Sequence, residues 1–285
     1  MICGSDQKLN FEYRNFRYYR CPACGLVSTY PLPDPVTLDS HYAKKFRDGN
    51  YQLLQAYSEQ YKSVYEGFVH ILNLKLQSRG QSLQDQKILD IGCFTGEFLE
   101  LLHQRGADVY GLELQSEAVD IADRKLPGRI FKADVFSNDF PQISCDIITL
   151  MGVIEHVTNP VKLFRRSTGL LKEGGILMLQ TPDSSSLFAR TMGKFWPPYA
   201  PVEHIHLFSR RSLELSLNEL GYANIEFMPH WKRLPISYVY NMFRNFGPEF
   251  YRLLGPLYKL LPRFVANSLL LFYIGEMIVI AQKKN

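Results

Sequence analysis

The pattern of hydrophobic and polar positions predicts alternating strands and helices from residue 87 onward. Residues 87–91 form an apolar run with the length and branching of a buried strand, and glycines at 92 and 96 then interrupt it. Apolar side chains return at helical spacing from Phe98 to Leu102, and Gly106 is a natural end for that helix. A strand, a glycine turn and a helix in this order are the first unit of a nucleotide-binding α/β sheet.

The same alternation continues along the chain. Ser116 is the expected N-cap of a helix to Lys125, another helix should run to about Leu171, and Ser209 should cap a helix to Leu220. Residues 182–208 are expected to form a long loop, and loops of this length are usually functional. The expected strands lie at 108–113, 130–134, 145–150, 176–181, 224–227 and 276–281.

Two segments fall outside this alternation. Residues 35–82 are expected to form a helical cap or linker, because aromatic side chains recur there every three to four residues. Tyr42 and Tyr61 are candidates for contact with cofactor or substrate, although amphipathic packing explains most of these aromatics. Residues 233–274 form an aromatic, leucine-rich and basic insertion. Its helices should be broken at Gly247-Pro248, Gly255-Pro256 and Pro262.

Composition narrows the functional classes. The chain has 285 residues, is 46% hydrophobic and carries a net charge of only +4, so nothing in it demands a nucleic-acid partner. Its N-terminus is polar and lacks the apolar stretch of a signal peptide, and its five cysteines do not indicate a disulfide framework. A cytoplasmic setting is therefore expected.

The glycine turn indicates which ligand the sheet binds. A dinucleotide fingerprint needs G-x-G-x-x-G, but Phe94 and Glu97 stand at the second and third glycine positions. A bulky ring and a carboxylate are poor neighbours for phosphate. The pattern formed by Asp90, Gly92 and Gly96 suits a phosphate-free, positively charged ligand such as S-adenosylmethionine (SAM).

Two acids follow in order. Glu113 ends the next strand, about 20 residues after the first glycine, where an acid can accept hydrogen bonds from both ribose hydroxyls. Asp134 ends a third strand, where it can accept from the adenine amino group. With these residues in order, the segment 87–220 resembles the class I SAM-dependent methyltransferases.

The resemblance implies a Rossmann-like, seven-stranded, mostly parallel sheet with a C-terminal antiparallel hairpin strand, in a methyltransferase domain spanning 83–285. It also implies a set of cofactor-binding residues: Asp90, Gly92, Cys93, Gly96, Glu113, Leu114, Asp134, Val135, Met151 and Gly152.

Residues 1–34 are expected to form a small zinc-ribbon-like module. Cys21 and Cys24 have the C-x-x-C spacing of a zinc knuckle, and Cys3 supplies a third thiolate. The stretch resembles the cysteine ribbon that precedes the methyltransferase domain in many enzymes of sugar and polysaccharide modification. A structural zinc ion on three visible ligands is expected, with a metal-free remnant as the alternative.

The loop after the fourth strand should face the transferred methyl group. Candidates for a base that deprotonates an acceptor hydroxyl are Glu155, His156, His204 and His206. Glu155-His156 resembles the acid–histidine pair of ubiquinone-pathway O-methyltransferases and small-RNA 2′-O-methyltransferases, where E-x-x-E-H and a later histidine hold a divalent metal. Gly152 replaces the first glutamate here, which argues against a catalytic metal, and a structural role for the pair is the alternative.

The acceptor is expected to be a small molecule. By family resemblance the first choice is a hydroxyl of a sugar or polysaccharide precursor. The alternatives are a quinone-like or lipid-linked acceptor at a membrane surface, and a non-catalytic SAM-binding module. Residues 233–274 can serve as a lid or dimer face, or they can lie on a membrane surface near a lipid-linked substrate.

Overall fold

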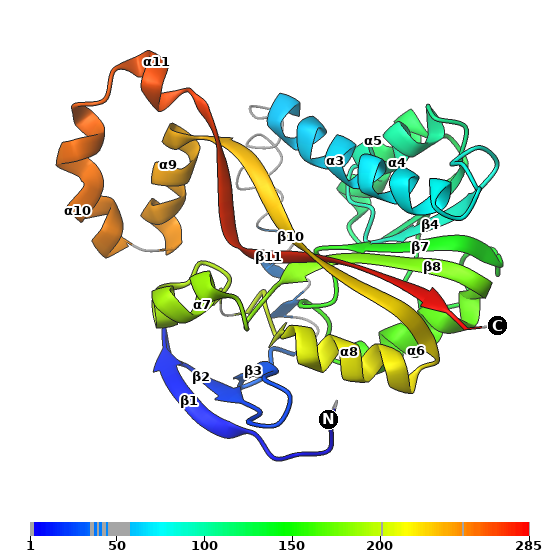
Figure 1. Ribbon diagram of the computed structural model, residues 1–285, viewed down its shortest axis with the longest axis horizontal. Helices are drawn as coiled ribbons and strands as arrows, with labels where there is room; N and C mark the ends of the chain where they lie inside the picture. Colours follow the sequence, from blue (N-terminus) through cyan, green and yellow to red (C-terminus); the bar gives the residue numbers. More distant parts are fainter. Residues whose placement is uncertain are drawn as a thin grey trace.

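A seven-stranded sheet is the centre of the molecule (Figure 1). The computed structural model describes residues 3–34, a few positions between 37 and 44, and 58–284 apart from 201 and 247. The strands follow the order β10-β11-β8-β7-β4-β5-β6. The parallel strands are β4 (Lys87–Ile91), β5 (Asp108–Glu113), β6 (Ile130–Lys132), β7 (Cys145–Met151) and β8 (Leu171–Pro182).

A hairpin completes the sheet. β11 (Leu269–Lys283) runs antiparallel between β8 and β10 (Tyr222–Pro235). The expected α/β class, with a mostly parallel seven-stranded sheet and a C-terminal antiparallel hairpin, is confirmed. Both hairpin strands are longer than the sequence suggested, because they continue beyond the sheet toward the inserted helices.

Helices cover both faces of the sheet, as parallel strands require. On one face lie α3 (Ser58–Gln77), α4 (Glu97–His103) and α5 (Ser116–Lys125); on the other lie α6 (Pro160–Leu170) and α8 (Arg210–Glu219) (Figure 1). Ser209 caps α8 in a capping box, as predicted. The prediction for α5 was wrong by one position: Gln115 occupies the N-cap and Ser116 is already helical. Tyr42 lies outside the described residues.

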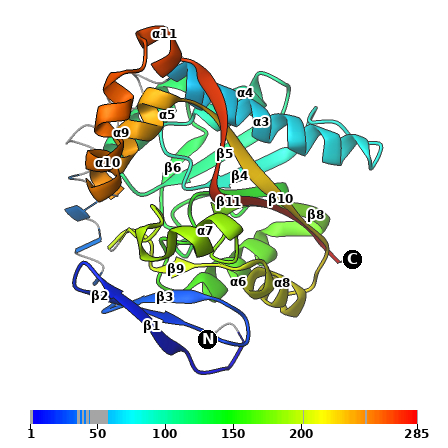
Figure 2. The ribbon, with the colours of Figure 1, turned by 60° about the vertical axis from the view of Figure 1, so that its left-hand side comes forward.

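The N-terminal segment forms its own small sheet, with strand order β1-β2-β3-β9. β1 (Lys8–Tyr13), β2 (Phe16–Arg20) and β3 (Val27–Tyr30) form a meander, and β9 (His206–Leu207) adds to its edge from far along the chain. Figure 2 shows this small sheet set apart from the main one.

The expected loop at 182–208 is only partly a loop. It contains β9, the short helix α7 (Leu187–Met192) and a 3-10 turn at Gly193–Phe195. Its aromatics are buried against the N-terminal sheet: the Tyr199 ring packs on Tyr18 at 5.0 Å and on Trp196 at 5.4 Å between centroids. No local pattern predicts this order, because Tyr199 packs on a residue of the N-terminal sheet that lies more than 170 positions earlier in the chain.

Three helices form an arm that projects from the far ends of β10 and β11 (Figures 1 and 2). They are α9 (Ile236–Phe246), α10 (Pro248–Lys259) and α11 (Arg263–Ala266). The expected break at Gly255-Pro256 is wrong, because α10 continues through Pro256. Stacking of Tyr240 on Tyr251 and Tyr258 of α10 holds the two helices together across this position. Within the described part of the chain, no helix combines the length and apolarity needed to span a membrane.

Candidate active site

The glycine turn after β4 has a backbone that only glycine adopts easily. Gly92 has φ 77° and Gly96 has φ 81°. A Cβ at Gly92 would lie 2.7 Å from Val153 Cγ2, and one at Gly96 would lie 3.1 Å from Ala122 Cβ. The turn therefore packs tightly both against the loop after β7 and against α5, and its positive φ angles and close contacts both favour glycine at these two positions.

Asp90 is buried at the end of β4, directly beneath this turn. Its Oδ1 accepts a hydrogen bond from Thr149 Oγ1 at 2.6 Å. Burial raises the pKa of Asp90 to about 7, against the lowering effect of the Thr149 bond. A cationic ligand would favour the ionised carboxylate, so the position fits the positively charged end of SAM.

Glu113 fastens the glycine turn to the next strand. Its Oε2 accepts from the Phe94 amide at 2.9 Å, and its Oε1 accepts from the amides of Leu114 and Gln115 at 2.8 and 2.9 Å. A carboxylate offers about four lone-pair directions. The side chain is thus held rigidly and retains acceptor capacity for hydroxyl donors, as the sequence predicted for the ribose.

The residues expected around adenine lie on two adjacent turns. Leu114, just after β5, is 55% exposed despite its apolar side chain. Asp134 closes a turn by accepting from the Phe136 amide at 2.9 Å, while Val135 is buried. Phe136 is an exposed apolar residue that sequence reasoning missed, although its position two residues after the expected acid was a usable signal.

Two of the expected cofactor residues have clear packing roles. Cys93 is buried, and its Sγ would lie 2.6 Å from a Cβ placed at Gly111. Burial raises the pKa of the Cys93 thiol well above its usual value, so this sulfur is a small core group. Gly152 lies in the loop after Met151, has φ 68°, and donates its amide proton to Gln180 O at 2.9 Å.

Three of the four expected base candidates converge beside Gly152. One ligand-type atom from each of Glu155, His156 and His204 lies within 4.8 Å of the other two. His156 Nδ1 is 2.9 Å from Glu203 O, and His204 Nδ1 is 2.6 Å from Pro198 O. A carbonyl oxygen only accepts, so each neutral ring carries its proton on Nδ1 and has its basic nitrogen at Nε2.

Glu155 completes this group from a buried position. Its Oε2 accepts from Thr181 Oγ1 at 2.9 Å, and its Oε1 lies 3.9 Å from His156 Nε2. Burial raises the pKa of Glu155 to about 8. One carboxylate and two imidazoles are a donor set that suits a divalent metal, even though Gly152 offers no side-chain ligand.

His206 lies apart from this group. Its Nδ1 is 3.0 Å from Ser28 Oγ, and its Nε2 is 3.3 Å from Thr158 O. Because Thr158 O only accepts, the neutral ring donates from Nε2 and accepts the Ser28 proton at Nδ1. Both nitrogens are thus engaged between the small sheet and the start of α6, which favours an orienting role.

Sequence reasoning missed a buried charged cluster next to Gly152. Glu276 of β11 accepts hydrogen bonds from Gln180 Nε2 at 2.9 Å, His230 Nδ1 at 3.0 Å and Lys232 Nζ at 2.8 Å. Burial alone would raise the pKa of Glu276, but Lys232 and His230 outweigh it and lower the pKa to about 2. The Gln180 Oε1 atom lies 3.6 Å from where a Gly152 Cβ would stand, so the cluster adjoins the candidate site.

The three N-terminal cysteines also converge. Cys3 Sγ and Cys21 Sγ are 3.4 Å apart, and the three sulfurs, including that of Cys24, lie within 4.8 Å of one another. A hydrogen bond from the Ser5 amide lowers the pKa of the Cys3 thiol to about 7, whereas burial raises that of Cys24 to about 12. Three thiols in one knuckle are a donor set that fits zinc, which deprotonates the thiols it binds.

Comparisons with known proteins identify the family of the chain. The sequence model of the family described as "Methyltransferase domain" matches residues 57–226, more than half of the chain. "Ubiquinone biosynthesis O-methyltransferase" of Actinobacillus pleuropneumoniae serotype 7 is 32% identical over 127 residues, covering 40% of this chain and 54% of the relative. The protein of the same name from Coxiella burnetii (strain Dugway 5J108-111) is 28% identical over 121 residues, covering 40% of this chain and 52% of that protein. The chain thus spans about half the length of the curated relatives it matches.

Solved structures share the fold at low sequence identity. Magnesium protoporphyrin IX methyltransferase from Synechocystis PCC 6803, solved with bound SAH, gives a TM-score of 0.57 at 14% identity over 88% of this chain and 100% of that one. A SAM-dependent methyltransferase from Thermotoga maritima gives 0.55 at 16% identity over 86% of this chain and 99% of that one.

The fold and the site define a class I SAM-dependent methyltransferase. The chain belongs to the methyltransferase-domain family whose model covers residues 57–226.

Proposed function

We propose that this methyltransferase transfers the methyl group of SAM to a hydroxyl oxygen of a quinone-like or lipid-linked acceptor at a membrane surface. The observation that carries the proposal is the similarity to ubiquinone biosynthesis O-methyltransferases over 40% of this chain. The sugar acceptor that the cysteine ribbon suggested has no counterpart among these relatives, so we place it second.

The proposed chemistry assigns proton removal to the group beside Gly152. SAM supplies a methyl carbon already activated by its sulfonium, so the chain has mainly to align the acceptor oxygen and accept its proton. His156 Nε2 lies 3.9 Å from Glu155 Oε1, His204 belongs to the same cluster, and a neutral imidazole is a suitable base near pH 7. Glu155 lies beside these rings, and an imidazolium that forms there would favour the ionised carboxylate of Glu155 and be stabilised by it.

The helical arm supports a membrane-facing acceptor. Leu253 and Leu257 lie one turn apart on α10 and are both exposed; Leu260, just after α10, is 80% exposed and Phe264 on α11 is 76% exposed. The segment 236–268 carries Arg244, Arg252, Lys259 and Arg263 against the single acid Glu249. Exposed leucines flanked by basic side chains are typical of helices that lie in the interface of an anionic bilayer.

A methyl-transfer assay tests the acceptor class. The protein is incubated with SAM and, in separate reactions, a hydroxylated aromatic ring with a hydrocarbon tail in vesicles, its tail-free analogue, and a panel of nucleotide sugars. We expect SAH release with the aromatic hydroxyl and a higher kcat/KM for the tailed compound. Turnover of a nucleotide sugar alone would overturn the proposal in favour of the second acceptor class.

Vesicle sedimentation tests the membrane contact separately. Replacing Leu257 and Phe264 by Ser should reduce binding to anionic vesicles at least tenfold, since each buried side chain contributes about 2 kcal/mol. Leu187→Ser is the matched control, because Leu187 on α7 is 76% exposed but lies outside the arm. Equal partitioning of the wild type and the double variant would remove the arm from the proposal.

We also propose that Cys3, Cys21 and Cys24 hold a structural zinc ion. Metal analysis should give about one zinc per chain, and Cys24→Ser should lower that content and the melting temperature together. Cys145→Ala is the control, since Cys145 lies in the core of the main sheet. Wild-type protein that holds no zinc as purified, or a Cys24→Ser variant that melts at the wild-type temperature, would contradict the assignment.

A further inference from the structure

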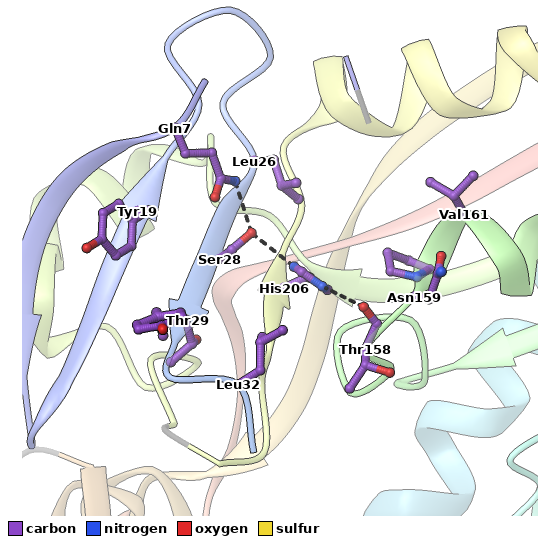
Figure 3. Close-up of a pocket in the computed structure, with 12 residues that line it drawn as sticks. Gln7, Tyr19, Leu26, Ser28, Thr29, Leu32, Thr158, Asn159, Val161 and His206 are labelled. Carbon is purple, nitrogen blue, oxygen red and sulfur yellow. Dashed lines mark hydrogen bonds between the residues drawn. The ribbon is translucent and has the colours of Figure 1, made fainter. Parts of the chain in front are cut away.

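A cavity lies between the small N-terminal sheet and the start of α6 (Figure 3). Its volume is about 490 Å³, within the range of small-molecule sites. β2 and β3 form one wall, β9 contributes His206, and the turn at residues 158–161 forms the opposite wall. We call it the junction pocket; it is separate from the glycine turn that fits SAM.

The lining of the junction pocket is uncharged. Tyr19 and Tyr30 supply aromatic rings, and Leu26, Leu32 and Val161 supply aliphatic surface. Among the described residues that line the pocket, none is acidic or basic apart from His206. Burial lowers the pKa of His206, so its ring is neutral at pH 7. A phosphate or carboxylate would therefore gain no lysine or arginine side chain from this lining to compensate its loss of hydration.

A chain of hydrogen bonds crosses the pocket in one fixed direction (Figure 3). Gln7 Nε2 donates to Ser28 Oγ at 3.0 Å, Ser28 lies 3.0 Å from His206 Nδ1, and His206 Nε2 lies 3.3 Å from Thr158 O. The Gln7 amide nitrogen only donates at one end of this series of hydrogen bonds, and the Thr158 carbonyl oxygen only accepts at the other. The position of every proton in the series is therefore assigned. The chain gives the pocket a rigid, neutral polar side.

Further polar groups of the lining remain available to a ligand. In the part of the chain that the structure describes, neither the Tyr19 hydroxyl nor the Thr158 hydroxyl has a hydrogen-bond partner. Asn159 caps α6 through its Oδ1, which accepts from the Lys162 amide, and this leaves its Nδ2 as a donor. Hydroxyl and amide groups beside aromatic rings suit a ligand that has both an apolar face and neutral polar edges.

We propose that the junction pocket binds an uncharged ring that carries hydroxyl or carbonyl groups. The tyrosine and aliphatic walls take the faces of the ring, and the neutral polar side takes its substituents. The absence of a charged partner in the lining discriminates against anionic analogues of similar size. This inference does not depend on the acceptor class proposed above.

The pocket is joined to the candidate active site through the backbone. The amides of Ile205 and His206 both donate to Glu155 O, at 2.7 and 3.1 Å. Thr29 Oγ1 donates to His204 O at 2.9 Å. A ring bound in the pocket would therefore rest on the same segment that positions Glu155 and His204. Two sources share the required chemistry: a distal ring of the methyl acceptor, and a separate small molecule.

Titration with simple rings tests the site. Catechol and methyl glucoside are the uncharged probes, and benzoate is the anionic one; each is titrated into the full chain by ligand-observed NMR in the absence of SAM. Leu32→Trp fills the pocket from its rim, where Leu32 is half-exposed. Leu9→Trp is the matched control, since Leu9 is a similarly exposed leucine of the same sheet but does not line the pocket. SAM affinity of each variant reports that the fold is intact.

We expect at least one uncharged probe to bind with a Kd at least tenfold lower than that of benzoate. Leu32→Trp should weaken that binding at least tenfold, and Leu9→Trp should not change it. The proposal is overturned if neither uncharged probe binds, or if benzoate binds as tightly as they do. It is also overturned if the Leu32→Trp variant binds the uncharged probe as tightly as the wild type does. Once a methyl acceptor is identified, its KM and kcat are measured with the Leu32→Trp variant. A raised KM for the acceptor at unchanged kcat identifies the ring as part of the acceptor. An unchanged KM, with probe binding lost, identifies a separate ligand.

Discussion

Replacing Glu113 by Ala should weaken SAM binding strongly. The substitution removes a carboxylate that holds three backbone amides, those of Phe94, Leu114 and Gln115, and that faces the expected ribose. Hydrogen bonds to a charged acceptor contribute about 1.5–3 kcal/mol each when they are made without competition from water. Water can reach the three amides once the side chain is gone, so most of the loss should appear in ligand binding. We expect about 1–3 kcal/mol, which is a fall in affinity of about 5-fold to 150-fold.

Calorimetric titration with SAM and with SAH measures this loss directly. Both ligands carry the ribose, so both affinities should fall by the same factor. Glu113→Gln keeps one acceptor oxygen and should give an intermediate affinity. Glu117→Ala is the control. Glu117 is an exposed acid in the first turn of α5, so its substitution by Ala removes the same charge. If Glu113→Ala binds SAM within twofold of the wild type, the placement of the cofactor along β5 is wrong.

Three further outcomes are expected. SAM affinity should fall roughly tenfold for each pH unit well below 7, because Asp90 has a pKa of about 7 and must be ionised to pair with a cation; Asp90→Asn should bind weakly with no such slope. Without SAM, the free energy of unfolding depends on pH in the opposite direction to SAM affinity. The stability that protonated Asp90 contributes is fully present below pH 4 and is lost as the pH rises through 7. Lys232→Met should lower the free energy of unfolding by about 3 kcal/mol, measured by urea denaturation at pH 7. The substitution leaves the buried negative charge of Glu276 without its lysine partner. Since the pKa of Glu276 is lowered to about 2, the stability it contributes is present above pH 4.5 and lost as the pH falls toward 2. His204→Gln should reduce kcat about 100-fold or more while His206→Gln reduces it less, and equal losses would contradict the assignment of the base.

The main sheet was predictable because its signals are local. Each parallel strand is a short apolar run, each following helix has its own periodicity, and Gly92 and Gly96 mark the ligand turn without reference to any distant residue. The positions of Asp90 and Glu113 follow from the same logic, since the carboxyl ends of parallel strands share one edge of the sheet.

The errors share a physical cause. Pro256 breaks an isolated helix, but tyrosines from α9 hold α10 together across it. The segment 182–208 looked like a loop because its aromatics Trp196 and Tyr199 are buried in a cluster that also needs Tyr18 and Val27 of the distant N-terminal sheet. In both cases tertiary packing outweighed the local preference of the chain.

The sequence by itself determined the class of fold, the glycine turn and the order of the acidic residues that are expected around the cofactor. Only the tertiary structure separated the histidines, placing His156 and His204 beside Glu155 while engaging His206 with Ser28. It also brought Glu276, His230 and Lys232 into one cluster next to Gly152. Periodicity records which side of an element is buried, whereas a site built from several elements depends on distances between residues that are remote in the chain. Those distances are fixed only when the sheet, its hairpin and the small N-terminal sheet pack together.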